Sequence, residues 1–126
     1  MEKLFIKETL NSPRVILDPG KKRYEISGKS FPENARAFYQ PVIDWLKNVS
    51  QSPPEKIRIS FMFDYISSSS VISIKQVLAR VKALNDTGAK IDVLWHYDPS
   101  DPDIKETGEE YEKVVGIKLQ FVENPS

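Results

Sequence analysis

The chain has 126 residues, of which 40% are hydrophobic, a size typical of one domain with a self-supporting core. Its 18 basic residues balance 18 acidic ones, which argues against a general attraction to nucleic acid or to an anionic membrane. The absence of cysteine excludes disulfides and thiol nucleophiles and fits a reducing cytoplasm. No stretch has the pattern of a secretion signal or approaches the roughly 20 apolar residues of a membrane span, so we expect a soluble, cytoplasmic domain over residues 1–126.

The N-terminal part of the chain contains short extended pieces. They read LFIK, RVILD and RYEISG, and the turn signals NSP and PGKK separate them. The second turn predicts a hairpin between Asp18 and Arg23.

The segment SFPENARAFYQPVIDWLKNV predicts the first helix. Ser30, with Glu33 three residues later, has the pattern of a capping box, and Pro32 suits a first helical turn. Apolar residues then recur at helical spacing, at Phe38, Val42, Trp45 and Val49. Because Pro41 lies inside this pattern, we expect a kink or a break there.

Three later segments alternate between apolar and polar residues, which predicts strands: KIRISFMF, KIDVLWHY and IKLQFVE. A loop, SQSPPEK, precedes the first of them. Strands buried on both faces would be continuously apolar, so the alternation predicts helices on one face only. The uncovered face carries Met62, Leu94 and Val122 among charges, which leaves a partner or self-association surface open as an alternative to an ordinary monomer surface.

Two more helices are predicted between these strands. One runs from the serines of YISSSSVISIKQVL to about Asn85, with Gly88 as a stop signal. The other spans roughly Asp103 to Val115, where Gly108 would let the helix approach the sheet closely. The predicted fold is therefore α/β: a single domain with a mixed β-sheet of about five strands and three helices on one face.

Four consecutive serines, from Ser67 to Ser70, lie in a strand-to-helix turn, where open sheets place their sites. Three interpretations stay open. The serines can simply cap the helix, since serine is a preferred N-cap. A hydrolase nucleophile would call for a G-x-S-x-G elbow, which is absent, and the only histidine, His96, lies on the polar face of its strand. A turn serine can also be phosphorylated, because a helix N-terminus accommodates a phosphoryl group.

The segment DPSDPD collects three aspartates but lacks the spacing of a calcium loop. We expect Asp103 to cap the third helix rather than Asp98, Asp101 and Asp103 to bind a metal. The glutamates at 106, 109, 110 and 112 predict a solvated helix face, with contact to a basic partner as the alternative. No metal or cofactor is expected.

Three segments, FPENARAFYQPVIDWL, FMFDYISSSSVISIKQVL and DVLWHYDPSD, resemble in order and spacing the SiaC family of bacterial regulatory phosphoproteins, over about residues 12–122. The resemblance implies a fold like that of anti-sigma-factor antagonists (STAS-like) and a protein that is not an enzyme. It also implies that a turn hydroxyl is phosphorylated by a dedicated protein kinase and released by a PP2C-like phosphatase. The unmodified form would bind and activate a diguanylate cyclase, and so control cyclic di-GMP and biofilm formation.

Matched by position to that family, the acceptor is Ser68, and Ser67 and Ser69 are alternates. Ser67 stands where the family usually has asparagine, so four adjacent serines compete for the role. We expect the partner to bind over the same turn, at Tyr65, Ser67, Ser69 and Ser70. The alternative function is a constitutive docking module in which the serines only cap the helix.

Overall fold

The computed structural model describes residues 2–49 and 56–124. The elements in chain order are β1 (Leu4–Ile6), β2 (Arg14–Asp18), β3 (Arg23–Ser30), α1 (Ala35–Val49), β4 (Ile57–Ile66), α2 (Ser68–Asp86), β5 (Ile91–Tyr97), α3 (Pro102–Val115) and β6 (Gln120–Glu123). The predicted order of elements is confirmed, but the described sheet has six strands rather than about five. The predicted SQSPPEK loop, apart from Lys56, lies outside the described residues.

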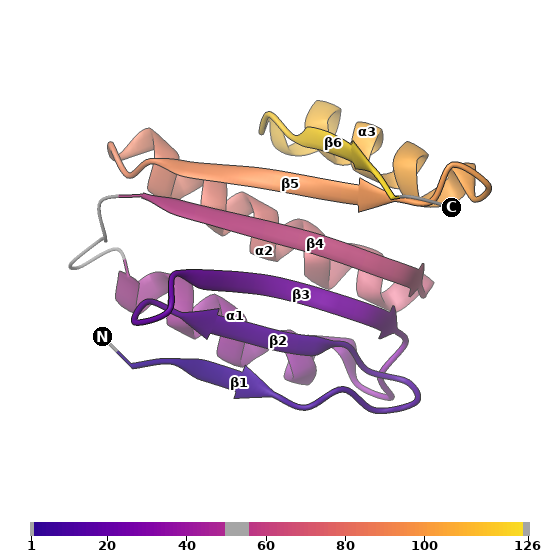
Figure 1. The fold of residues 1–126 in the computed structure, drawn as a ribbon, viewed down its shortest axis with the longest axis horizontal. Helices are drawn as coiled ribbons and strands as arrows, with labels where there is room; N and C mark the ends of the chain where they lie inside the picture. Colours follow the sequence, from indigo (N-terminus) through magenta and orange to yellow (C-terminus); the bar gives the residue numbers. More distant parts are fainter. Residues whose placement is uncertain (1, 50–55, 125–126) are drawn as a thin grey trace.

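The six strands lie side by side in chain order, from β1 at one edge to β6 at the other. The first three pair antiparallel, and the predicted hairpin is confirmed by the pairing of Asp18 with Arg23. The strands β3, β4, β5 and β6 pair in parallel, so each step along the sheet needs a helical crossover. These crossovers are expected to be right-handed, and each leads to the next strand in the same direction across the sheet. All the crossover helices therefore lie on the same face of the sheet. All three helices accordingly lie behind the sheet (Figure 1).

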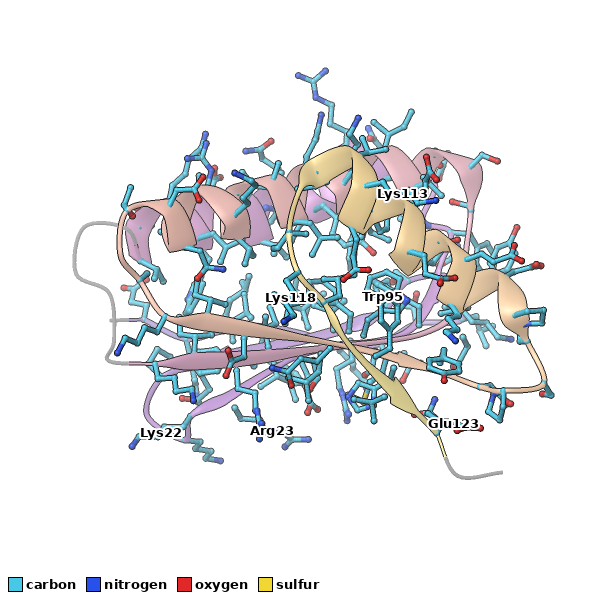
Figure 2. The ribbon with its side chains drawn as sticks, turned by 90° about the horizontal axis from the view of Figure 1, so that it is seen from above. Lys22, Arg23, Trp95, Lys113, Lys118 and Glu123 are labelled. Carbon is cyan, nitrogen blue, oxygen red and sulfur yellow. The ribbon has the colours of Figure 1, made fainter. Side chains whose placement is uncertain are left out.

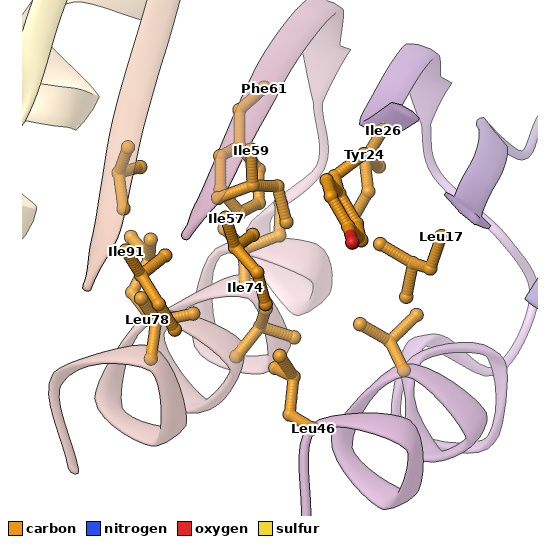
Figure 3. Packing of buried hydrophobic residues seen from close by; sticks show 14 of the residues in the cluster. Leu17, Tyr24, Ile26, Leu46, Ile57, Ile59, Phe61, Ile74, Leu78 and Ile91 are labelled. Carbon is orange, nitrogen blue, oxygen red and sulfur yellow. The ribbon is translucent and has the colours of Figure 1, made fainter. Parts of the chain in front are cut away.

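The core lies between the sheet and this helical layer. The predicted alternation of β4 and β5 is confirmed: the inward residues of both strands are buried, and Arg58 on the other face is exposed. Figure 3 shows Ile57 and Ile59 of β4 facing Ile74 and Leu78 of α2. Two tryptophans, Trp45 and Trp95, belong to the same core.

The predicted capping box at the start of α1 is wrong. The helix begins at Ala35, and Asn34 caps it by accepting a 3.1 Å hydrogen bond at Oδ1 from the backbone N–H of Ala37. Ser30 is the fully buried last residue of β3, and its hydroxyl bonds to side chains of other elements instead. Pro41 does not break α1; it is exposed, so water can satisfy the carbonyl that lacks its N–H partner.

The third helix also begins differently from the prediction. Asp101, not Asp103, is its N-cap, and its carboxylate accepts the N–H of Asp103 at 3.2 Å. Pro102 takes the first helical position, where a missing N–H costs nothing, and this shifts the cap to Asp101. The close approach at Gly108 is confirmed, since a β-carbon there would lie 2.6 Å from Nε1 of Trp95.

The face of the sheet that the helices leave uncovered is mixed: charged side chains lie there beside the half-buried Met62, Leu94 and Val122, as predicted. Figure 2 shows Lys22 and Arg23 on this side and Trp95 on the helical side. Ion pairs link Glu25 to Arg14 and Arg23, at 3.1 and 2.8 Å. The last strand is shorter than predicted: β6 begins at Gln120, and the irregular chain before it buries Ile117 and Leu119 but leaves Lys118 exposed. Within residues 2–49 and 56–124, no helix is both long and apolar enough to cross a bilayer.

Candidate functional site: the serine turn

The serine turn, Ser67 to Ser70, joins the end of β4 to the start of α2. Ser67 is the N-cap, with extended backbone angles of −74° and 162°, and the helix begins at Ser68. The backbone N–H of Ser67 donates to the carbonyl of Ser30 at 2.8 Å. This bond continues the pairing of β3 with β4, so the position of the turn is set by the sheet.

A β-bulge just before the turn reverses the side-chain alternation of β4. Gly28 pairs with Phe63, but Lys29 pairs with Tyr65, so Asp64 is an extra residue in β4. Phe63 is buried, whereas Tyr65, two residues later, is 52% exposed. The bulge therefore turns an aromatic side chain outward next to the serines.

Two of the four serines are committed to the structure of the turn. Oγ of Ser67 accepts the N–H of Ser70 at 3.2 Å and donates to Oγ of Ser70 at 3.0 Å. Ser70 is fully buried and also accepts from Oγ of Ser30 at 2.9 Å, while Ser30 shares a 2.6 Å hydrogen bond with the hydroxyl of Tyr39. These four side chains form a hydroxyl chain that runs from the surface into the core.

Two buried tyrosines hold the first turn of α2 from its two neighbouring helices. Tyr39 of α1 reaches it through the hydroxyl chain, and Tyr111 of α3 donates to the carbonyl of Val71 at 2.7 Å. Burial raises the pKa of both tyrosine hydroxyls, and the nearby Tyr39 raises that of Tyr111 further. Both are therefore neutral hydrogen-bonding groups at physiological pH.

The other two serines, Ser68 and Ser69, are exposed in the first turn of α2. Ser69 lies 3.3 Å from the hydroxyl of Ser67 and lines a groove beside α1. The predicted position of Ser68, exposed at the start of the helix, is confirmed, and its modification stays a prediction. The first turn carries no acidic residue, so no carboxylate within it offsets the positive end of the helix dipole.

Three exposed apolar side chains, Phe31, Tyr65 and Ile72, lie near these serines. Phe31 and Tyr65 pack edge to face with ring centroids 5.7 Å apart, and Ile72, 63% exposed, lies one helical turn after Ser68. Of the three, only Tyr65 was predicted at the partner site. Ser30 pairs with Ile66 in register, so the parallel pairing of β3 and β4 is the signal that would have placed Phe31 beside the turn.

The other sequence candidates do not gather at the serine turn. His96 follows the inward-facing Trp95 in β5, so it lies on the open face of the sheet, opposite α2, and does not form a triad with the serines. Asp98 is exposed and accepts from the backbone N–H and the hydroxyl of Ser100, which lowers the pKa of its carboxyl group. Across the described part of the chain, no three His, Cys, Asp or Glu side chains are grouped as a metal ion would require.

Comparison with known proteins identifies the family. The model of the SiaC family, described as regulatory phosphoproteins, matches residues 6–124. The chain belongs to this family. Its members are regulatory proteins, so the chain is not itself an enzyme. An uncharacterized protein of Pseudomonas aeruginosa (strain UCBPP-PA14) is 25% identical over 111 residues, which are 88% of each chain.

Solved structures show the same fold. SiaC of Pseudomonas aeruginosa is 23% identical and superposes with a TM-score of 0.85 over 98% of this chain and 100% of that one. A chain of the crystal structure of the diguanylate cyclase SiaD in complex with its activator SiaC is 22% identical, with a TM-score of 0.86 over 96% and 99% of the two chains. The likeness to the STAS fold stays a prediction.

Proposed function

We propose that this protein is a phosphorylation-controlled signalling switch whose acceptor is Ser68. A partner kinase phosphorylates the serine, a PP2C-like phosphatase releases it, and the unmodified form binds and activates a diguanylate cyclase. Membership in a family of regulatory phosphoproteins supports the switch, and the complex of SiaD with its activator SiaC supports a cyclase as the effector. The output would then be cyclic di-GMP and biofilm formation.

The observation that carries this proposal is that the four serines of the turn have different structural roles. Ser67 and Ser70 supply the cap and the buried hydrogen bonds, which leaves the exposed hydroxyl of Ser68 without a structural task in the described residues. Phosphorylation of Ser68 would keep the cap and place about −1.5 to −2 charges at the positive end of α2. The helix would tolerate that charge, so the effect falls on whatever binds there.

The surroundings of Ser68 suggest how the charge acts on a partner. Phe31, Tyr65 and Ile72 are exposed apolar side chains near it, and a partner that covers them would also cover Ser68. A phosphoryl group buried in such a contact without a cation costs several kcal/mol. Phosphorylation should therefore release the partner.

The acceptor is tested by intact-mass measurement after incubation with the cognate kinase and ATP. Wild type should gain one phosphoryl group, Ser68→Ala none, and the matched control Ser69→Ala one. If Ser68→Ala gains a phosphoryl group and Ser69→Ala gains none, the acceptor is Ser69 and not Ser68. No gain by wild type or either variant would favour the constitutive docking module.

The switch is tested by titrating three forms against the cyclase while binding and cyclic di-GMP synthesis are measured. Unmodified protein and Ser68→Ala should bind and stimulate alike, because removing an exposed hydroxyl that caps nothing leaves the turn intact. The phosphorylated form should do neither. Ser68→Asp, with one charge, should fall between them. Equal stimulation by all forms would reject the switch.

A further inference from the structure

A groove runs between α1 and α2 on the outer surface of the helical layer. Its wider part, about 800 Å³, begins at the serine turn and includes Ser69. A second part, about 410 Å³, continues along the same two helices and shares Arg36 and Gln76 with the first. The two parts therefore make one continuous groove, which starts at Ser69, next to the proposed acceptor Ser68.

The groove is cationic although the chain as a whole is neutral. Arg36, Lys47 and Arg80 line it, and its only lining carboxylate among the described residues is Glu33, at the end near the serines. Arg36 and Arg80 form no ion pair within the described part of the chain. In contrast, on the open face of the sheet Arg14 and Arg23 are both paired with Glu25.

The rest of the lining is half polar, with Asn34, Gln40, Ser69, Ser73 and Gln76, and half apolar or small. Ile72 and Ile43 project from the two helices, and alanines at positions 35, 79 and 83 form part of the surface between them. Small residues let another backbone approach closely, and the exposed Ile72 and the partly buried Ile43 offer contacts for apolar side chains. A cationic groove with apolar contacts between two helices suits an amphipathic helix with acidic flanks. Nucleic acid would be expected to use a more extensive basic surface.

We propose that the groove between α1 and α2 binds an acidic amphipathic helix of the partner protein. Apolar residues of that helix would contact Ile43 and Ile72, and its carboxylates would pair with Arg36 and Arg80. The regulatory part of this inference rests on the proposed function. A phosphoryl group on the serine turn adds negative charge at one end of the groove, where it repels the acidic helix and competes for Arg36.

Charge reversal tests this proposal directly. The double variant Arg36→Glu/Arg80→Glu should weaken binding of the unmodified protein to the cyclase at least about tenfold and reduce the salt dependence of binding. Arg58→Glu is the matched control, because it places the same change on an exposed arginine of the opposite face. It should bind as wild type does. Thermal unfolding of each variant checks that the fold is retained.

Two synthetic peptides test the groove without the cyclase. Both carry leucines at helical spacing; one has glutamates on the flanks of the apolar face and the other has lysines. The glutamate peptide should bind wild type and shift amide resonances of α1 and α2, and the double variant should prefer the lysine peptide. Anionic vesicles and single-stranded DNA, tested in parallel, should not bind.

The outcomes separate this inference from the proposed function. If wild type and the double variant stimulate the cyclase equally, the groove proposal is overturned and the switch stands. If the cyclase does not respond to wild type, the proposed effector fails, and the peptides decide on the groove. In that case, failure of the glutamate peptide to bind, or binding of vesicles or DNA in its place, overturns the groove proposal.

Discussion

Two strand-to-helix turns, after β4 and after β5, both cap the helix that follows, but they do so with different side chains. The serine turn caps α2 with a neutral hydroxyl, whereas Asp101 caps α3 with a carboxylate. The serine turn sends Ser70 into the core, while Asp98 and Asp103 remain exposed. A turn built from carboxylates is negative in every state of the protein. A neutral turn can gain charge by modification, which makes it the better place for a switch.

The serine turn is itself divided into an inner and an outer half. Ser67 and Ser70 belong to the hydroxyl chain that reaches Tyr39, and Ser68 and Ser69 face solvent. The inner half fixes the backbone, so the outer half can change chemically without moving it. Negative charge should therefore have opposite effects at positions only two residues apart.

The largest effect is expected from Ser70→Asp. The variant buries a carboxylate among hydroxyls with no cation beside it, which should destabilise the protein by several kcal/mol or prevent folding. Ser68→Asp is the matched control and should change stability by less than about 1 kcal/mol, in the stabilising direction, through the helix dipole. Urea unfolding followed by circular dichroism measures both, and equal midpoints would remove the distinction between the two halves.

Much of the fold could be predicted from the sequence, because alternation and helical spacing are local patterns that burial imposes directly. The strands β4 and β5 and the helix α2 follow from these patterns. The three-residue β1 shows why the number of strands was underestimated: such a short piece has too few residues to display an alternation. Its place in the sheet comes from its pairing with β2.

The shift of the α3 cap from Asp103 to Asp101 is local, since it follows from Pro102, but the other errors concern residues whose partners are distant in the sequence. Ser30 has the pattern of a cap, but its hydroxyl bonds to Ser70, 40 residues away, and no local pattern reveals that contact. The position of Ser68 was predictable because a cap and a helix start are local features. The groove and Phe31 were missed since they depend on the packing of α1 against α2 and of β3 against β4.

High pH should weaken the inner half of the serine turn. Burial raises the pKa of Tyr39 and Tyr111 above that of an unfolded tyrosine, about 10, so both stay protonated in the folded state where the unfolded chain ionises. Their contribution to stability is complete below pH 10. Above it, the free energy of unfolding should fall by up to about 1.4 kcal/mol per pH unit for each tyrosine.

Urea titrations between pH 8 and pH 11 measure this effect. Tyr39→Phe should show a shallower loss above pH 10, at the expense of about 1 kcal/mol at neutral pH for the hydrogen bond with Ser30. Tyr65→Phe is the control, because this tyrosine is half exposed and lies outside the hydroxyl chain. An unchanged slope in Tyr39→Phe would mean that Tyr39 ionises without opening the turn.

The two caps should differ in strength. Asp101→Ala removes one hydrogen bond to an exposed N–H and should cost about 1 kcal/mol. Ser67→Ala removes the cap of α2 and also a donor to the buried Ser70, so its cost should approach about 2 kcal/mol. Thermal unfolding of both variants against wild type gives the comparison. A larger loss of stability in Asp101→Ala than in Ser67→Ala would show that the buried part of the hydroxyl chain does not depend on Ser67.

The smallest expected effect concerns the carboxylate of Asp98 in the turn after β5, which runs from Asp98 to Asp101. The backbone N–H and the hydroxyl of Ser100 donate to the ionised form of Asp98 and lower the pKa of its carboxyl group, so its stabilising contribution is present at neutral pH and is lost as the pH falls below about 4. Ser100→Ala removes the hydroxyl donor and should raise this pKa toward its usual range. Carboxyl carbon NMR titration of Asp98 in wild type and in Ser100→Ala measures the shift. Ser67 to Ser70 carry no carboxylate that could titrate in this range, whereas a phosphoryl group on Ser68 should titrate near pH 6. If the pKa of Asp98 is the same in wild type and in Ser100→Ala, the hydroxyl of Ser100 does not stabilise the ionised carboxylate. The turn after β5 would then be held by backbone hydrogen bonds alone, without the contribution of side-chain hydroxyls that the serine turn has.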